Sequence, residues 1–158
     1  MKVYIGADHR GFELKGKLIP WIKSMGHEIY DLGNLKYDKD DDFPDFSLVV
    51  AENVAENPGS RGIVICGSGC GVNVAANKVV GVRCSTGVNA HEVEHARAHD
   101  DLNILALSAD YIPEEINKEM IEVFLKTPFS NEERHIRRIK KIKEYENKGC
   151  GGCCGGCK

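Results

Sequence analysis

The chain has 158 residues, of which 42% are hydrophobic, and it carries 21 Lys and Arg against 24 Asp and Glu, a net charge of -3. A chain of this length buries about 68–70% of its unfolded surface, enough for a core without disulfides or a structural metal. Whole-chain disorder and a coiled coil are excluded, and the mildly acidic balance argues against general affinity for nucleic acid. No apolar run reaches the ~18–20 residues of a membrane span.

Three of the seven cysteines, Cys66, Cys70 and Cys84, lie in apolar or glycine-rich segments at irregular spacing. Such spacing is typical of a reducing compartment and not of a disulfide framework. The N-terminus lacks the pattern of a secretory signal peptide. We therefore expect a cytoplasmic protein with no membrane or nucleic-acid partner.

The C-terminal segment has a composition of its own. The other four cysteines follow one another in Cys150-Gly-Gly-Cys153-Cys154-Gly-Gly-Cys157. We therefore divide the chain into a folded domain over residues 1–147 and a Gly/Cys-rich tail over residues 148–158. We expect the tail to be an appendage with little effect on activity. Zinc binding or reversible disulfides at its four thiols is the alternative.

The first part of the chain predicts alternating strands and helices. A buried strand over residues 3–5 precedes apolar residues at helical spacing over 14–25, where Pro20 predicts a kink or a restart. A second strand covers residues 28–31. An acidic loop over 38–45 follows it.

The central part continues this alternation. Apolar spacing predicts a helix over 46–54, which the Asn-Pro-Gly sequence at 57–59 ends. Residues 63–66 form the most apolar strand. A glycine-rich turn and a helix of small residues through Ala76 follow, and a fourth strand is expected at 82–84.

The last part completes the pattern. An asparagine cap opens a helix over 89–98, and a fifth strand covers 104–107. A proline starts a helix over 113–127, and Ser130 with Glu133 predicts the cap of a final helix. Five apolar strands that alternate with helices imply a parallel sheet covered on both faces. We predict the α/β class, as a three-layer αβα Rossmann-like domain with a five-stranded parallel sheet.

Ligands of an open parallel sheet bind beyond the carboxyl ends of its strands. The first strand delivers Asp8, His9 and Arg10, and the third delivers Cys66 and the glycine run up to Gly71. The helix before the fifth strand ends at His99. We expect the thiol, the two imidazoles and the carboxylate to converge at one edge.

The glycine run after Cys66 offers backbone N–H groups at a helix N-terminus, which can hold an anion. The same field favours a thiolate, so Cys66 is a candidate base or nucleophile. The alternative is a small buried residue that finishes a strand. The run matches neither a dinucleotide-binding fingerprint nor a phosphate-binding P-loop.

A second motif, His91-Glu92-Val93-Glu94-His95, fits H-E-x-x-H on a predicted helix and suggests a zinc hydrolase. A third ligand such as Glu114 or Glu115 would have to complete that site. Two histidines on a solvated helix face are the alternative that we favour.

The final helix carries a candidate anion clamp. Arg134 and Arg138 lie about 40° apart around the helix axis, beside an apolar stripe of Ile139, Ile142 and Tyr145. Two guanidinium groups so placed can bind a phosphate bidentately. Ordinary surface charges are the alternative.

Several motifs in order resemble the ribose-5-phosphate isomerase B family, which includes galactose-6-phosphate and allose-6-phosphate isomerases. The resemblance runs from Met1 to about Tyr145. The motifs are Gly6-Ala-Asp-His9, Asp42-Phe-Pro-Asp45, Gly62-Ile-Val-Ile-Cys-Gly-Ser-Gly-Cys-Gly71, Ala75-Ala-Asn-Lys78, His99-Asp-Asp101, Asn103-Ile-Leu-Ala106 and Arg134-His-x-x-Arg138.

The resemblance implies an isomerase of the pentose phosphate pathway that interconverts ribose 5-phosphate and ribulose 5-phosphate through a cis-enediolate. It implies neither metal nor cofactor. It also implies a homodimer, or a tetramer, whose sites draw residues from both subunits. The alternatives are an isomerase of a hexose 6-phosphate, and a non-catalytic phosphosugar-binding module that would not depend on Cys66.

The resemblance also implies roles for individual residues. Cys66 would be the base, His99 would open the sugar ring, and Asp8 and Ser68 would orient sugar hydroxyls. The remaining positions are expected to bind the substrate, through backbone amides of the glycine run or through side chains that include the phosphate ligands. They are His9, Gly67, Gly69, Cys70, Gly71, Asp100, Asp110, Arg134 and Arg138.

The chain departs from the family pattern at four positions. Ser68 stands where threonine is usual, Phe43 where tyrosine is usual, and Asp100 where asparagine is usual. Asp110 stands where many members have an arginine near the phosphate. A carboxylate there would repel phosphate if it pointed inward, so we expect it to turn away or the other basic residues to suffice.

Overall fold

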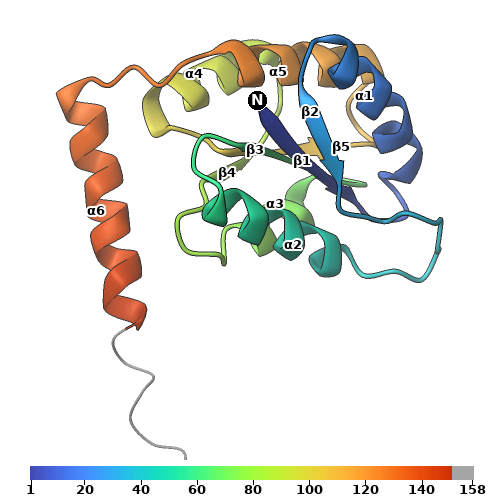
Figure 1. The fold of residues 1–158 in the computed structure, drawn as a ribbon, viewed down its shortest axis with the longest axis horizontal. Helices are drawn as coiled ribbons and strands as arrows, with labels where there is room; N and C mark the ends of the chain where they lie inside the picture. Colours follow the sequence, from blue (N-terminus) through green and yellow to red (C-terminus); the bar gives the residue numbers. More distant parts are fainter. Residues whose placement is uncertain (151–158) are drawn as a thin grey trace, which may run out of the picture.

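The computed structural model describes residues 1–150 and confirms the predicted α/β class (Figure 1). The strands are β1 (Lys2–Ala7), β2 (Glu28–Asp31), β3 (Arg61–Cys66), β4 (Cys84–Thr86) and β5 (Ile104–Ser108). The helices are α1 (Phe12–Ser24), α2 (Phe43–Glu56), α3 (Cys70–Ala76), α4 (Ala90–Asp100), α5 (Glu114–Lys126) and α6 (Glu133–Cys150). Among these residues no helix has the length and apolarity to cross a membrane.

The five strands form one parallel sheet in the order β2-β1-β3-β5-β4. After β1 the chain moves outward to β2, and after α2 it returns on the other side of β1 to form β3. The carboxyl ends of β1 and β3 therefore lie side by side where the direction of winding reverses. In open α/β sheets this is the position at which ligands bind.

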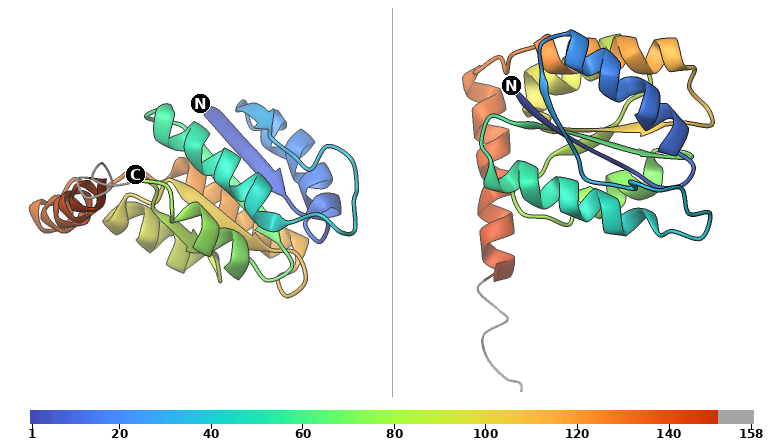
Figure 2. Two further views of the ribbon diagram at one scale, coloured as in Figure 1. Left: turned by 90° about the horizontal axis from the view of Figure 1, so that it is seen from below. Right: turned by 45° about the vertical axis from the view of Figure 1, so that its right-hand side comes forward.

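Helices cover both faces of the sheet, with α1, α4 and α5 on one side and α2 and α3 on the other (Figures 1 and 2). Successive residues of β3 alternate between the two cores, as the period of a strand requires. Ile63 and Ile65 pack with α1 and α5, whereas Val64 and Cys66 pack with α2 and α3. The thiol of Cys66 therefore faces the α2 and α3 layer.

Some element boundaries differ from those predicted. α1 is one continuous helix through Pro20, without a restart. α2 begins at Phe43, inside the segment expected to be a loop, because Pro44 occupies its first turn, where a missing N–H costs nothing. The fourth strand begins at Cys84, after a turn in which Gly81 has a φ of 85°.

The start of the final helix also differs from the prediction. α6 begins at Glu133, two residues later than a Ser130 cap would place it, because Asn131 has a left-handed φ of 57°. The hydroxyl of Ser130 accepts the backbone N–H of Glu132 at 3.3 Å and lies 2.7 Å from Nδ1 of His135. The helix runs to Cys150, and the cysteines at 153, 154 and 157 with the rest of the tail lie outside the described residues.

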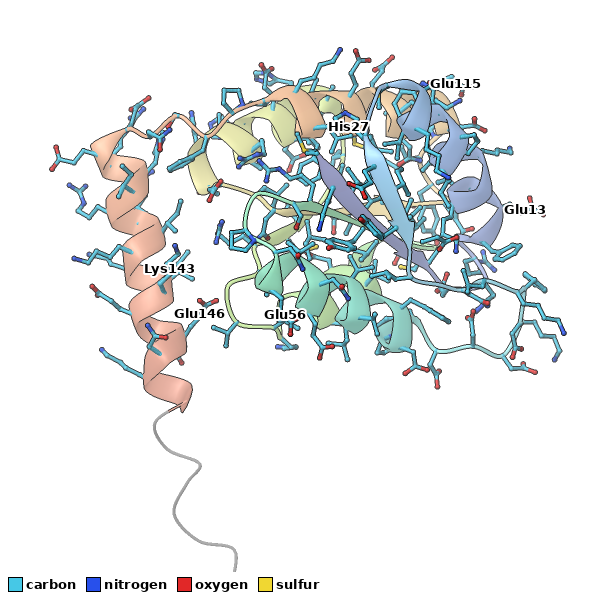
Figure 3. All side chains as sticks on the ribbon, viewed as in Figure 1. Glu13, His27, Glu56, Glu115, Lys143 and Glu146 are labelled. Carbon is cyan, nitrogen blue, oxygen red and sulfur yellow. The ribbon has the colours of Figure 1, made fainter. Side chains whose placement is uncertain are left out.

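α6 projects along one side of the body (Figures 1 and 2). His135 and Ile139 are buried, but Ile136, Ile142 and Tyr145 are 48%, 49% and 78% exposed. Lys143 and Glu146 lie on the side of α6 that faces the body (Figure 3). The apolar stripe predicted from the sequence is therefore largely uncovered in a single chain.

We expect Phe124→Ala to lower the free energy of unfolding by about 3–5 kcal/mol, because the ring of Phe124 is fully buried beneath the sheet on α5. Glu119→Ala on the exposed face of the same helix serves as the control. Urea unfolding at a fixed protein concentration measures both. Equal effects of the two substitutions would contradict this account of the core.

Candidate active site at the carboxyl edge of the sheet

Three loops meet at the carboxyl edge of the sheet, as the sequence predicts. Asp8 follows β1, and its backbone N–H donates to the carbonyl of Ile65 at 3.2 Å. Asp110 follows β5, and its N–H donates to the carbonyl of Gly67 at 3.0 Å. These bonds fix the loops after β1 and β5 against the loop that begins at Cys66.

The thiol of Cys66 is buried, with 5% of the residue exposed. The backbone N–H of Gly69 donates to its Sγ at 3.1 Å. Gly69 has a φ of 77°, a conformation that favours glycine and that turns this amide toward the sulfur. An N–H group aimed at a sulfur stabilises negative charge there, which suits a base or a nucleophile.

The other thiol of the central region has a different environment. Burial raises the pKa of Cys84 to about 12, so this side chain stays protonated at neutral pH. Ser68 lies on the exposed side of the Cys66 loop, where its Oγ accepts the N–H of Cys70 at 3.2 Å. Cys66 therefore has a backbone donor, whereas Cys84 is an inert thiol in the same core.

His9 is held by Asp41, a residue that the sequence analysis did not single out. Oδ1 of Asp41 accepts the backbone N–H of His9 at 2.9 Å and lies 2.7 Å from its Nδ1. This hydrogen bond raises the pKa of His9, so the ring keeps its positive charge to a higher pH than usual. The arrangement leaves Nε2 of His9 to meet an anion.

Asp41 belongs to a longer chain of hydrogen bonds. Its Oδ2 accepts from Nδ2 of Asn34 at 2.6 Å, and the carbonyl of Asn34 accepts from Nζ of the buried Lys15 at 2.7 Å. Lys15 also donates to Asp31 at 2.6 Å. Burial alone would raise the pKa of Asp41, but the donors from His9 and Asn34 outweigh it and lower that pKa.

Asp8 is buried and shapes the turn after β1. Its Oδ1 accepts the backbone N–H groups of Arg10 and Gly11 at 2.9 and 3.0 Å. Burial raises the pKa of Asp8, although these bonds oppose the shift. Asp8 therefore fixes the direction in which His9 and Arg10 leave the strand.

Asp110 forms an ion pair with Arg10. Oδ2 of Asp110 accepts from Nη2 of Arg10 at 2.6 Å and from Nε at 3.1 Å. The sequence analysis expected this carboxylate to turn away or the other basic residues to suffice; in the structure it is neutralised by a neighbouring guanidinium. Arg10 was not among the predicted site residues.

The predicted convergence of His99 with Cys66 is wrong within one chain. α4 runs back along the sheet and ends beside the start of β5, where Ile104 pairs with Gly62, whereas Cys66 pairs with Ser108. Ile104 and Ser108 are four residues apart along β5, which corresponds to about 13 Å along the strand. Helices that connect parallel strands return to the amino edge, so the end of α4 and the carboxyl end of β3 lie at opposite edges.

Asp100, Arg134 and Arg138 belong to the same distant group. Asp100 is the last residue of α4, and both arginines are exposed near the start of α6, on the side away from the strand arrowheads (Figure 1). Arg134 pairs with Glu132 at 2.8 Å. One chain therefore places the predicted site residues in two groups, at opposite edges of its sheet.

Three imidazole rings pack together in the group of residues at the amino edge. The ring of His99 lies 3.8 Å from that of His95 and 4.3 Å from that of His135, between centroids. Desolvation, followed by the charges of His95, His135 and Arg134, lowers the pKa of His99. The ring of His99 is therefore neutral over a wider range of pH than usual.

The H-E-x-x-H sequence lies on α4, as predicted, with His91, Glu92 and His95 exposed. Within residues 1–150 there is no group of three or more His, Cys, Asp or Glu side chains that could hold a metal ion. The packing of His95 against His99 accounts for its position. The zinc-hydrolase alternative has no support in this geometry.

Comparison with known proteins decides the family. The model of the ribose/galactose isomerase family matches residues 3–142. The chain belongs to this family. Ribose-5-phosphate isomerase B of Mycobacterium tuberculosis is 41% identical over 146 residues, covering 92% of this chain and 90% of the relative.

Solved structures of family members have the same fold. Ribose-5-phosphate isomerase B of Mycoplasma genitalium, with bound ribulose-5-phosphate, superposes with a TM-score of 0.90 at 39% identity, covering 93% of this chain and 97% of that one. The enzyme of Clostridium thermocellum superposes with a TM-score of 0.88 at 40% identity, covering 94% and 99%. The isomerase fold therefore extends over nearly the whole of each chain.

We expect Asp41→Asn to lower the pKa of His9 toward its ordinary value of about 6.5, because the charged partner of the ring is lost. His9 is charged below its pKa and loses that charge as pH rises through it, so the variant loses the charge at lower pH. NMR titration of the ring protons measures the shift. Asp40→Asn, which alters an exposed neighbour paired with Lys39, serves as the control, and an unchanged pKa in Asp41→Asn would refute the assignment.

Proposed function

We propose that this chain interconverts ribose 5-phosphate and ribulose 5-phosphate through a cis-enediolate, with Cys66 as the base and without a metal. The observation that carries the proposal is the N–H of Gly69 donating to Sγ of Cys66 at the reversal point of the sheet. The relatives named ribose-5-phosphate isomerase B, about 40% identical, support the choice of a pentose phosphate.

The chemistry needs a base that can move one proton between neighbouring carbons. The Cys66 thiolate would take the proton from C2 of the open-chain aldose and return it to C1, while a proton passes from O2 to O1. The negative charge of the enediolate needs donors in the meantime. The Gly69 amide is engaged with the sulfur, whereas within residues 1–150 the Ser68 amide has no partner and can bind the enediolate oxygen.

The other side chains of this edge would position the substrate. Asp8, with its raised pKa, would bind a sugar hydroxyl, as would the exposed Ser68. Asp41 raises the pKa of His9 and so favours the positive charge that binds a phosphate. Phosphate binding at His9 would anchor the reacting carbons at a fixed distance from the thiol.

The group of residues at the amino edge requires a second copy of the chain. His99 would open the furanose ring, and Arg134 and Arg138 would hold the phosphate, but one chain places all three far from Cys66. A two-fold axis in a homodimer would bring the amino-edge group of one protomer to the carboxyl edge of the other. The exposed apolar stripe of α6 is the surface that such a partner would cover.

Cys66→Ala and Cys66→Ser are expected to lose turnover of ribose 5-phosphate by a factor of about 10²–10⁴ or more, because the base is removed. The assay follows formation of ribulose 5-phosphate in the presence of a chelator. Cys84→Ser, which alters the inert thiol, should keep its activity. Full activity of Cys66→Ala would refute the mechanism.

The same assay separates the alternatives. Wild-type protein that turns over only galactose 6-phosphate or allose 6-phosphate would point to a hexose phosphate isomerase. Phosphosugar binding without turnover of any of these substrates would point to a binding module. Loss of activity in chelator that zinc restores would contradict the metal-independent mechanism.

Mixed dimers test the shared site. Cys66→Ala and His99→Asn should each be inactive, but mixing them under subunit exchange should restore about a quarter of wild-type activity. Random pairing makes half of the dimers mixed, and each mixed dimer contains one intact site. No recovery, with exchange confirmed by mass spectrometry of a tagged partner, would contradict a site built from both subunits.

A further inference from the structure

Arg10 has free N–H donors along one edge of its guanidinium group, which lies beside the loop that follows Cys66. Its Nε and Nη2 both donate to Oδ2 of Asp110. Within residues 1–150 the guanidinium makes no other hydrogen bond, and the side chain is 56% exposed. An arginine has five N–H donors, so Nη1 and the second hydrogen of Nη2 remain as a free pair along the end of the group.

The position of the guanidinium is fixed at both ends. Oδ1 of Asp8 accepts a hydrogen bond from the backbone N–H of Arg10 at 2.9 Å. The backbone N–H of Asp110 donates to the carbonyl of Gly67 at 3.0 Å. Asp110, in the segment after β5, is therefore tied to the loop that follows Cys66. Such a clamp orients the free edge of the guanidinium at little further cost in side-chain entropy.

The ion pair lies directly against the thiol loop. A Cβ built on Gly67 would stand 2.5 Å from Oδ2 of Asp110 and 3.4 Å from Nε of Arg10. A glycine is required at 67 because the pair occupies the space above it. Arg10 also follows His9 directly, so two cationic groups leave the end of β1 together.

We propose that Arg10 binds the phosphate group of the substrate through its Nη1 and Nη2 edge, and that Asp110 is its positioning residue and does not contact the substrate. The inference rests on the proposed isomerase function and adds the residue that selects a phosphorylated sugar. A planar pair of N–H donors matches two phosphate oxygens, which an ammonium group does not reproduce.

Arg10→Ala is expected to raise KM for ribose 5-phosphate by about 10- to 100-fold and to change kcat by less than about threefold. The Kd of inorganic phosphate, measured by calorimetry, should rise by a similar factor. Arg10→Lys should recover part of both losses. The matched control is Lys17→Ala, which removes an exposed cation of α1 that pairs with Glu114 of α5. This variant should change neither the KM nor the Kd of phosphate.

The double variant Arg10→Ala/Asp110→Ala should bind phosphate more tightly than Arg10→Ala. In the single variant Asp110 is left unpaired, and its carboxylate repels the phosphate. Asp110→Ala alone should also weaken phosphate binding, because Arg10 loses the partner that orients it. Wild-type phosphate affinity in Asp110→Ala would refute the positioning role of Asp110.

The readouts separate this inference from the proposed function. Unchanged KM and phosphate affinity in Arg10→Ala would overturn it, as would a fall in kcat with both affinities intact, because the residue would then serve only the loop. If the wild type isomerises no sugar phosphate but its phosphate affinity depends on Arg10, the proposed function fails and the binding role stands.

Discussion

The parallel direction of the strands decides which residues of this chain can meet. All carboxyl ends lie at one edge, so the segments after β1, β3 and β5 form a common surface with Asp8, Cys66 and Asp110. Every connecting helix must then return to the opposite edge. The same geometry that assembles the thiol loop therefore separates it from the end of α4.

The two edges of the sheet differ in the electrostatic surroundings of their cationic side chains and imidazole rings. At the carboxyl edge each cation has an acidic neighbour: His9 has Asp41, and Arg10 has Asp110. At the amino edge His99 packs between two other imidazoles, in surroundings that disfavour its charged form. One edge thus favours positive charge, and the other favours a neutral ring.

Much of the fold could be predicted from the sequence, because buried parallel strands such as 63–66 are apolar throughout and the helices between them have capping and stop signals. The strand order follows the rules for α/β sheets. The boundaries at Phe43, Cys84 and Glu133 could not be predicted, because a proline, a glycine turn and the left-handed Asn131 decided them locally.

The gathering of side chains at the carboxyl edge was predictable where a residue ends a strand, as Cys66 does, or follows one closely, as Asp8 and His9 do. The position of His99 at the other edge already followed from the predicted parallel sheet, because a helix that connects two parallel strands ends at the amino edge. The roles of Asp41 and Arg10 could not be predicted for another reason. Each acts through a partner distant in sequence, and a charged residue in a polar segment carries no signal of that partner.

The hydrogen-bonded chain from Lys15 through Asn34 and Asp41 to His9 connects the active edge to the outermost part of the sheet. β2 has four residues and only one neighbouring strand, so it is a region where local unfolding costs least. Fraying of β2 and the segment after it would release Asn34 and then Asp41, and His9 would lose the partner that keeps it charged. The charge of His9 is thereby coupled to the integrity of an edge strand that lies on the far side of β1 from β3.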